Sequence, residues 1–275
     1  MNEKVSLITG ANSGIGLALT KKILTEQGKV IALIRSSFPT DDSVLTQAIA
    51  HGRITIYQAN LSDFASLKAA LKAIKQHKPA LDVIFNNAGV STATLEFSPQ
   101  GRELQFEVNT VVPYILLMEL KECLSANGSR KVINTSSNAA LYVKKFRVEE
   151  LDRPNHFKKL FGPYAASKLA LTLWTREVAS WLSTEGIRIA SVDPGGNQSK
   201  MTASTSMPLV LRLVAKFMFS PASTGAQRLQ DAARQLSDAE TGAFFIKGKP
   251  ASYRFQEQGN ALLSKLHAIY RQEYL

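Results

Sequence analysis

The sequence predicts an α/β fold, with a doubly wound, mostly parallel sheet, helices on both faces, and one domain spanning residues 1–275. Short apolar runs alternate with helix-length segments, as is typical of a parallel sheet covered on both faces. A glycine-rich turn joins the first run to the first helix. The 275 residues, 45% of them hydrophobic, suffice for one large core, and no repeat or linker divides them.

The expected strands are the apolar runs 4–9, 30–34, 54–57, 83–86, 131–135, 187–192 and 244–246. The expected helices are 14–27, 41–50, 63–77, 101–126, 162–184 and 222–236. Ligands of such sheets bind beyond the carboxyl ends of the strands. Side chains at those ends are therefore the candidates for a functional site.

The turn after the first strand carries glycines with the spacing G-x-x-x-G-x-G. Its residues include Gly10, Asn12, Ser13, Gly14, Ile15 and Gly16. Glycines at a strand–helix junction let a pyrophosphate approach backbone N–H groups and the positive end of the helix. The turn therefore predicts a dinucleotide site.

Tyr164 and Lys168 stand four residues apart in an expected helix, so they share one face. A free tyrosine has a pKa of about 10. A nearby ammonium favours the phenolate, so we expect Lys168 to lower the pKa of Tyr164 and make it an acid or base.

Several further motifs follow in a recognisable order: Asn86-Asn87-Ala88-Gly89, Asn109, Ser136-Ser137, Tyr164-x-x-x-Lys168 and Pro194-Gly195. With the glycine-rich turn, they resemble the compact, non-extended branch of the short-chain dehydrogenase/reductase family over residues 4 to about 200. The tail, through residues 220–226 and 241–245, is similar to the retinol-dehydrogenase-like part of that family. The resemblance implies a Rossmann-type fold and an oxidoreductase. Separately, the sequence shows no apolar signal segment and no run of membrane-span length, so a cytoplasmic protein is expected.

The resemblance also implies four catalytic roles. Tyr164 gives a proton to a carbonyl oxygen, and Lys168 both tunes Tyr164 and holds the nicotinamide ribose. Ser137, in preference to Ser136, donates a hydrogen bond to the substrate oxygen. Asn109 helps to hold a water chain near Lys168.

The cofactor contacts implied by the resemblance lie at strand ends. They are the glycine-rich turn, Asn60 and Leu61, the run Asn87, Ala88 and Gly89, the pair Tyr164 and Lys168, and the turn Pro194 and Gly195. Asn60 stands where the family commonly has aspartate, and Ser199 where it often has threonine. Both departures keep a hydrogen-bonding group.

The end of the second strand favours NADP(H) over NAD(H). It reads Ile34-Arg35-Ser36-Ser37 and has no carboxylate to bind ribose hydroxyls and repel a 2′-phosphate. An arginine binds phosphate through a fork of donors. Arg35 is therefore the candidate for the 2′-phosphate contact.

Other function classes find little support. A Ser-His hydrolase would need a histidine partner and a Gly-x-Ser-x-Gly elbow, and the sequence contains no such elbow. No group of histidines, cysteines or carboxylates has the spacing of metal ligands. The net charge of +11 is scattered, without the basic stripe of a nucleic-acid binder. The alternative left open is a non-catalytic NADP(H)-binding sensor or scaffold protein, which has no need of the tyrosine acid.

The substrate is predicted only by class. Residues 138–163 form a basic, aromatic insertion, and residues 203–219 are strongly apolar. As covers of a substrate pocket, they indicate a lipophilic carbonyl or alcohol. For 203–219, a subunit interface and a peripheral membrane helix stay open, as do a monomeric or homodimeric state and the direction of hydride transfer.

Overall fold

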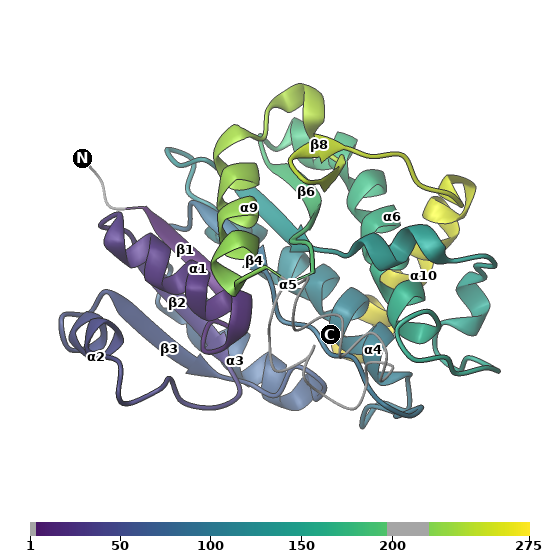
Figure 1. Ribbon diagram of the computed structural model, residues 1–275, viewed down its shortest axis with the longest axis horizontal. Coiled ribbons are helices and arrows are strands. Elements are labelled where there is room, and N and C mark those ends of the chain that lie inside the picture. The colour runs from purple at the N-terminus through teal and green to yellow at the C-terminus, as the bar shows by residue number, and fades with distance from the viewer. Residues whose placement is uncertain (1–3, 197–219) are drawn as a thin grey trace.

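The computed structural model describes residues 4–196 and 220–275. One eight-stranded sheet forms its centre, with strand order β3-β2-β1-β4-β5-β6-β7-β8 (Figure 1). Its strands are β1 (Val5–Thr9), β2 (Lys29–Ile34), β3 (Ile54–Gln58), β4 (Val83–Asn86), β5 (Lys131–Thr135), β6 (Arg188–Asp193), β7 (Phe244–Ile246) and β8 (Lys249–Pro250). The first seven are parallel and β8 is antiparallel, so the predicted fold class is confirmed.

Helices cover both faces of this sheet (Figure 1). The face packed by α1 (Gly14–Thr25), α2 (Ser43–Ala50) and α9 (Ala222–Gln235) forms one hydrophobic core. The face packed by α3 (Phe64–Gln76), α5 (Val112–Leu120), α6 (Pro163–Thr184) and α10 (Gly259–Ile269) forms the other. Successive strand residues point to opposite faces, so Leu7 lies in the second core and Ile8 in the first.

The strand order reverses at β1. The chain builds β2 and β3 on one side of β1 and then crosses to place β4 on its other side. Beyond the carboxyl ends of β1 and β4 the following segments therefore diverge, which opens the crevice where such sheets bind ligands.

The long helix expected over 101–126 is broken into pieces. Leu104–Phe106 (α4) is helical, Glu107–Val111 (η1) is a π-helical turn, and α5 follows from Val112. Pro113 stands in the first turn of α5 and has no N–H to donate to the preceding turn. Such π turns occur frequently at functional sites, and this one carries Asn109.

Among the described residues, the helix α10 and the short strand β8 were not predicted from the sequence. The insertion 138–163 contains only short 3₁₀ turns, Asn138–Tyr142 (η3) and Val148–Glu150 (η4). In the described residues, no helix combines the length and the apolar character needed to span a bilayer.

Candidate active site

The glycine-rich turn lies between β1 and α1, as predicted. Gly10 and Gly14 have positive φ values of 66° and 51°, which favour glycine. A Cβ on Gly16 would lie 2.1 Å from the carbonyl oxygen of Gly10, so the helix starts too close to the turn for any side chain.

The N-terminus of α1 is open to an anion. Ser13 is its N-cap, but the Ser13 side chain makes no capping hydrogen bond, and the first turn holds no acidic residue. Its N–H groups and positive dipole therefore suit a phosphate. The turn thus fits the pyrophosphate of a dinucleotide.

The Asn87-Ala88 turn is tied to the end of β1. The hydroxyl of Thr9 accepts hydrogen bonds from the backbone N–H of Asn87, at 3.0 Å, and of Ala88, at 2.9 Å. The Asn87 amide donates to the carbonyl of Thr9 at 3.0 Å. Asn86 braces the sheet, because its amide donates to Asn134 on β5 at 2.8 Å.

A cavity of about 480 Å³ extends from this turn past the end of β2. The predicted cofactor residues that line it are Gly10, Asn12, Ser13, Arg35, Asn60, Leu61, Ala88 and Gly89. The described lining contains Arg35 and no aspartate or glutamate. The cavity thus has one fixed positive charge at the place where cofactor types differ.

The loop after β2 is held by Asn12. Its amide donates to the carbonyl and hydroxyl oxygens of Ser36, at 2.6 and 3.0 Å, and to the carbonyl of Ser37, at 3.2 Å. Asn12 therefore acts in the structure as a brace for the loop that carries Arg35.

The side-chain oxygen of Asn60 is already used in hydrogen bonds within its own turn. Its Oδ1 accepts from the hydroxyl of Ser62 at 2.9 Å and from the Ser62 N–H at 3.3 Å. The Asn60 amide nitrogen is thus the group left to face a ligand in the cavity, whereas an aspartate would have offered a second acceptor.

Lys168 is a buried residue of α6, and its Nζ donates a hydrogen bond of 2.7 Å to the carbonyl oxygen of Thr135, at the end of β5. Burial lowers the pKa of Lys168 to about 8. Its Nζ lies 3.4 Å from the position of a Cβ built on Gly89, so the ammonium reaches the Asn87–Gly89 turn.

Tyr164 is also buried, and Lys168 Nζ lies 6.0 Å from the centre of its ring. Burial raises the pKa of Tyr164 to about 12, the hydrogen bond with Ser137 opposes this rise, and the charge of Asp193 adds to it. The expectation that Lys168 lowers this pKa is therefore wrong for the protein alone. Burial dominates, and Nζ is directed to Thr135.

The two serines after β5 point to different neighbours. Ser136 donates to the Lys168 carbonyl at 3.2 Å and contacts the Thr172 hydroxyl at 2.8 Å, so it fastens β5 to α6. Ser137 caps η3, accepting from the Ala139 N–H at 3.1 Å, and hydrogen-bonds Tyr164. Ser137 is therefore the serine that faces the phenol.

Asn109 connects the turn after β4 to α6. Its Oδ1 accepts from the Val90 N–H at 2.8 Å, and its Nδ2 donates to the Val90 carbonyl at 2.9 Å and the Ser167 hydroxyl at 3.0 Å. Its Oδ1 lies 3.1 Å from a Cβ built on Gly89, so Asn109 and Lys168 approach the same glycine.

Asp193 is a neighbour of Tyr164 that sequence reasoning missed. It ends β6, is buried, and accepts a hydrogen bond of 3.0 Å from the Gly195 N–H. Arg228 on α9 donates to the Pro194 carbonyl at 2.8 Å. The position of Asp193 beside the Pro194-Gly195 motif was visible in the sequence, whereas nothing there signalled Arg228. Ser199 and residues 203–219 lie outside the described residues.

The family model described as short chain dehydrogenase matches residues 4–149 and 154–208. The chain belongs to this family. The predicted family is thereby confirmed, and so is the prediction that the protein is an oxidoreductase.

Similar proteins include retinol dehydrogenases. Retinol dehydrogenase 12 of Mus musculus is 30% identical over 227 residues, covering 82% of this chain and 71% of its own. A 3alpha-hydroxysteroid dehydrogenase of Mediterraneibacter gnavus is 27% identical over 220 residues, covering 78% of this chain and 82% of its own.

Solved structures share the fold. The NADPH-bound carbonyl reductase from chicken fatty liver has a TM-score of 0.66 and 22% identity, covering 92% of this chain and all of its own. A 4-hydroxyisoleucine dehydrogenase complexed with NADH has a TM-score of 0.68 and 23% identity, covering 90% and 98%. The fold thus accommodates either cofactor.

Proposed function

We propose that this protein is an NADP(H)-dependent oxidoreductase that interconverts a carbonyl and an alcohol on a lipophilic small molecule, with Tyr164 as the general acid and base. The observation that carries the proposal is the cluster of buried Tyr164 and Lys168 with half-buried Ser137, beyond the carboxyl ends of β5 and β6. It lies at the sheet edge that also carries the glycine-rich turn.

The residues of the cluster divide the work of carbonyl reduction. When bound, the reduced nicotinamide supplies a hydride to the carbonyl carbon. Tyr164 carries its proton at neutral pH and can give it to the carbonyl oxygen, although burial by itself makes the phenol a weaker acid. The Ser137 hydroxyl donates a hydrogen bond to that oxygen as negative charge develops. Oxidation of an alcohol reverses these proton movements.

Lys168 has a positional and an electrostatic role in this scheme. Its Nζ has three donors, and the Thr135 carbonyl takes one of them. The others lie beside Gly89, where we place the nicotinamide ribose. An ammonium held there stabilises a phenolate on Tyr164 after the proton has left.

The preference for NADP(H) rests on the charge of the cavity beyond β2. A 2′-phosphate carries negative charge, and the described lining offers Arg35 without an opposing carboxylate. An aspartate or glutamate at this strand end would instead bind the ribose hydroxyls of NAD(H).

A lipophilic substrate is supported by the relatives' names. Retinol and hydroxysteroids, which those names specify, are apolar molecules with a hydroxyl or carbonyl group. The competing proposal, a non-catalytic NADP(H)-binding sensor, gives no reason for a cluster of a buried tyrosine and lysine with a half-buried serine.

Tyr164→Phe tests the proposal. The variant keeps the ring and loses only the proton, so carbonyl reduction, followed at the nicotinamide absorbance, should fall by about 10²–10⁴-fold. The affinity for NADPH, measured by fluorescence titration, should remain. More than a tenth of the wild-type rate in Tyr164→Phe would refute the acid, and no turnover of any aldehyde, ketone or alcohol by the wild type would favour the sensor.

A further inference from the structure

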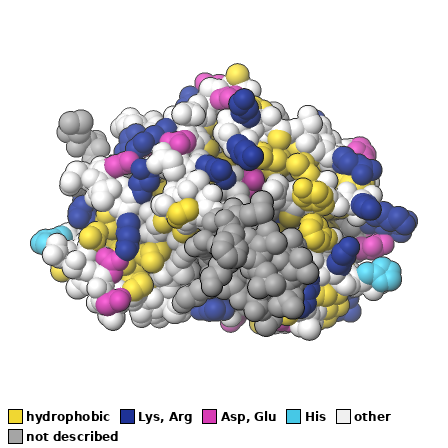
Figure 2. Space-filling view, viewed as in Figure 1, with side chains coloured by type: hydrophobic (Ala, Val, Ile, Leu, Met, Phe, Trp, Pro, Cys, Tyr) yellow, Lys and Arg dark blue, Asp and Glu magenta, His cyan; other side chains and the backbone are white. Residues whose placement is uncertain are grey.

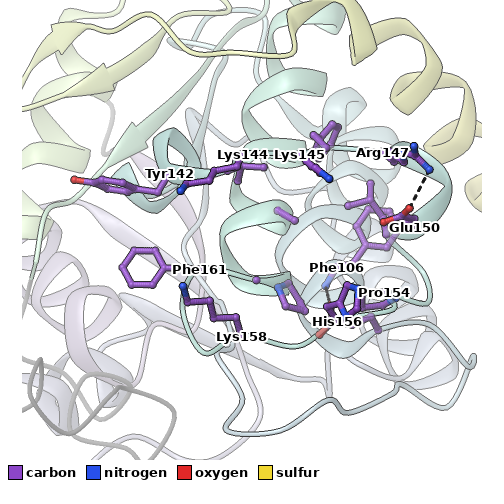
Figure 3. A pocket seen from close by; sticks show the side chains of 17 residues that line it. Phe106, Tyr142, Lys144, Lys145, Arg147, Glu150, Pro154, His156, Lys158 and Phe161 are labelled. Atoms are coloured by element: carbon purple, nitrogen blue, oxygen red, sulfur yellow. Dashed lines mark hydrogen bonds and ion pairs between the residues drawn. The ribbon is translucent and has the colours of Figure 1, made fainter.

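A second cavity, of about 610 Å³, lies between the insertion 138–163 and the first turn of α6 (Figure 3). Four side chains of its described lining are cations: Lys144, Lys145, Arg147 and Lys158. Its size is that of a site for a small organic ligand.

The positive charge of this lining is neutralised only in part. Of the two acidic residues in the described lining, Glu150 pairs with Arg147 at 3.5 Å. Glu103 is fully buried and accepts hydrogen bonds from the Phe106 N–H, at 2.7 Å, and from Gln105, at 3.0 Å. Within the part of the chain that the structure describes, no ion pair involves Lys144, Lys145 or Lys158. The three lysines are exposed and leave a surplus of positive charge.

The same cavity has aromatic walls. Tyr142 and Phe161 meet edge to face with their ring centres 5.8 Å apart, and Tyr142 is 61% exposed. Lys158 Nζ lies 5.8 Å from the Phe161 ring centre, so one cation is held beside the aromatic pair. Figure 2 shows hydrophobic side chains next to Lys and Arg on the side of the molecule where Figure 1 places this insertion.

Helix geometry separates the cavity from the reaction centre. Consecutive residues of an α-helix are about 100° apart around its axis. Pro163 and Ala166, which line the cavity, therefore lie about 100° and 160° away from Tyr164. Lys168 is only about 40° from Tyr164. A ligand in the cavity thus contacts a flank of α6 that is turned away from the phenol.

We propose that this cavity binds an amphipathic organic anion, an apolar chain or ring that bears one carboxylate, sulfonate or phosphate. The apolar body packs on Tyr142 and Phe161, and the lysines bind the anionic head. An anionic lipid surface carries the same kind of head group. The experiment below therefore compares a free anion with lipid vesicles.

Decanoate is the test ligand, and 1-decanol is its neutral counterpart. Calorimetric titrations compare the wild type, the triple variant Lys144→Gln/Lys145→Gln/Lys158→Gln, and a matched control, Lys72→Gln/Lys78→Gln/Lys249→Gln. The control removes the same charge from exposed positions outside the cavity. We expect decanoate to bind the wild type and the control equally and the triple variant at least tenfold more weakly. Decanol should bind all three alike, and NADPH should not displace decanoate.

Three results would overturn the proposal. If decanoate bound the control variant as weakly as the triple variant, the effect would come from the overall positive charge of the protein and not from the cavity. Displacement of decanoate by NADPH would place the anion in the cofactor cavity. If the triple variant lost binding to phosphatidylserine vesicles but kept its affinity for decanoate, the lysines would contact a membrane surface instead. None of these results depends on whether Tyr164→Phe is inactive, so this proposal and the proposed function fail separately.

Discussion

Lys168 is fastened to the sheet by Thr135, whose carbonyl oxygen accepts a hydrogen bond of 2.7 Å from Nζ. The contact joins the buried ammonium on α6 to the end of β5. It holds the charge beside the turn after β4, with Nζ 6.0 Å from the centre of the Tyr164 ring. A neutral carbonyl compensates the buried charge only in part, which is why burial lowers the pKa of Lys168 to about 8.

This pKa makes the stability of the protein depend on pH. Between about 8 and the ordinary value of 10.5, the unfolded chain binds more protons than the native one. The free energy of unfolding therefore rises with pH across this window, and the buried charge costs its full amount below pH 8. The effect is about 1.4 kcal/mol for each unit of pKa shift.

Lys168→Met removes this titration. Urea unfolding at pH 7 to 10 should show that the wild type gains stability relative to Lys168→Met as pH rises above 8. Lys72→Met, at an exposed position, is the control and should follow the wild type. The same pH dependence in all three proteins would mean that Lys168 does not titrate in this range.

Arg35→Ala tests the choice of cofactor. A hydrogen bond to a charged group contributes about 1.5–3 kcal/mol, so NADPH should bind about ten- to a hundredfold more weakly and NADH almost unchanged. Arg271→Ala removes an exposed arginine elsewhere and should alter neither affinity. If NADPH and NADH both bound more weakly by the same factor, Arg35 would contact a part of the cofactor that the two molecules share. Tighter binding of NADH by the wild type would contradict the interpretation of the β2 end.

Asn109→Ala tests the connection between the β4 turn and α6. It leaves the backbone N–H and carbonyl of Val90 without their Asn109 partners. Val90 is half-buried, so each of these groups left unsatisfied costs at most about 1–3 kcal/mol, the penalty for a fully buried group. Urea unfolding should therefore show a loss of this order, together with weaker NADPH binding. The exposed Asn127→Ala is the control. Unchanged stability would mean that water replaces the amide.

The sequence allowed the sheet and the site motifs to be placed, because both depend on local pattern. Apolar runs marked each strand from β1 to β7, and the glycine spacing marked the start of α1. The π turn at Asn109 was missed because it results from Pro113 and from packing on α6. The pKa of Tyr164 was mispredicted because its burial, and the direction in which Lys168 Nζ points, are properties of the folded chain.

The last prediction separates the two serines after β5. Ser137 faces Tyr164, so Ser137→Ala should lower kcat for carbonyl reduction by about 10²–10³-fold, as for other donors to a developing oxyanion. Its stability should change little, since the hydroxyl otherwise only caps the short η3.

Ser136 fastens β5 to α6 from a buried position. Ser136→Ala should therefore cost about 1 kcal/mol of stability and reduce kcat far less. Steady-state kinetics measure kcat, and urea unfolding measures the free energy of unfolding, for both variants. If Ser136→Ala lost the greater part of kcat while remaining folded, the catalytic donor would be Ser136, and the hydrogen bond between Ser137 and Tyr164 would belong to the resting protein alone.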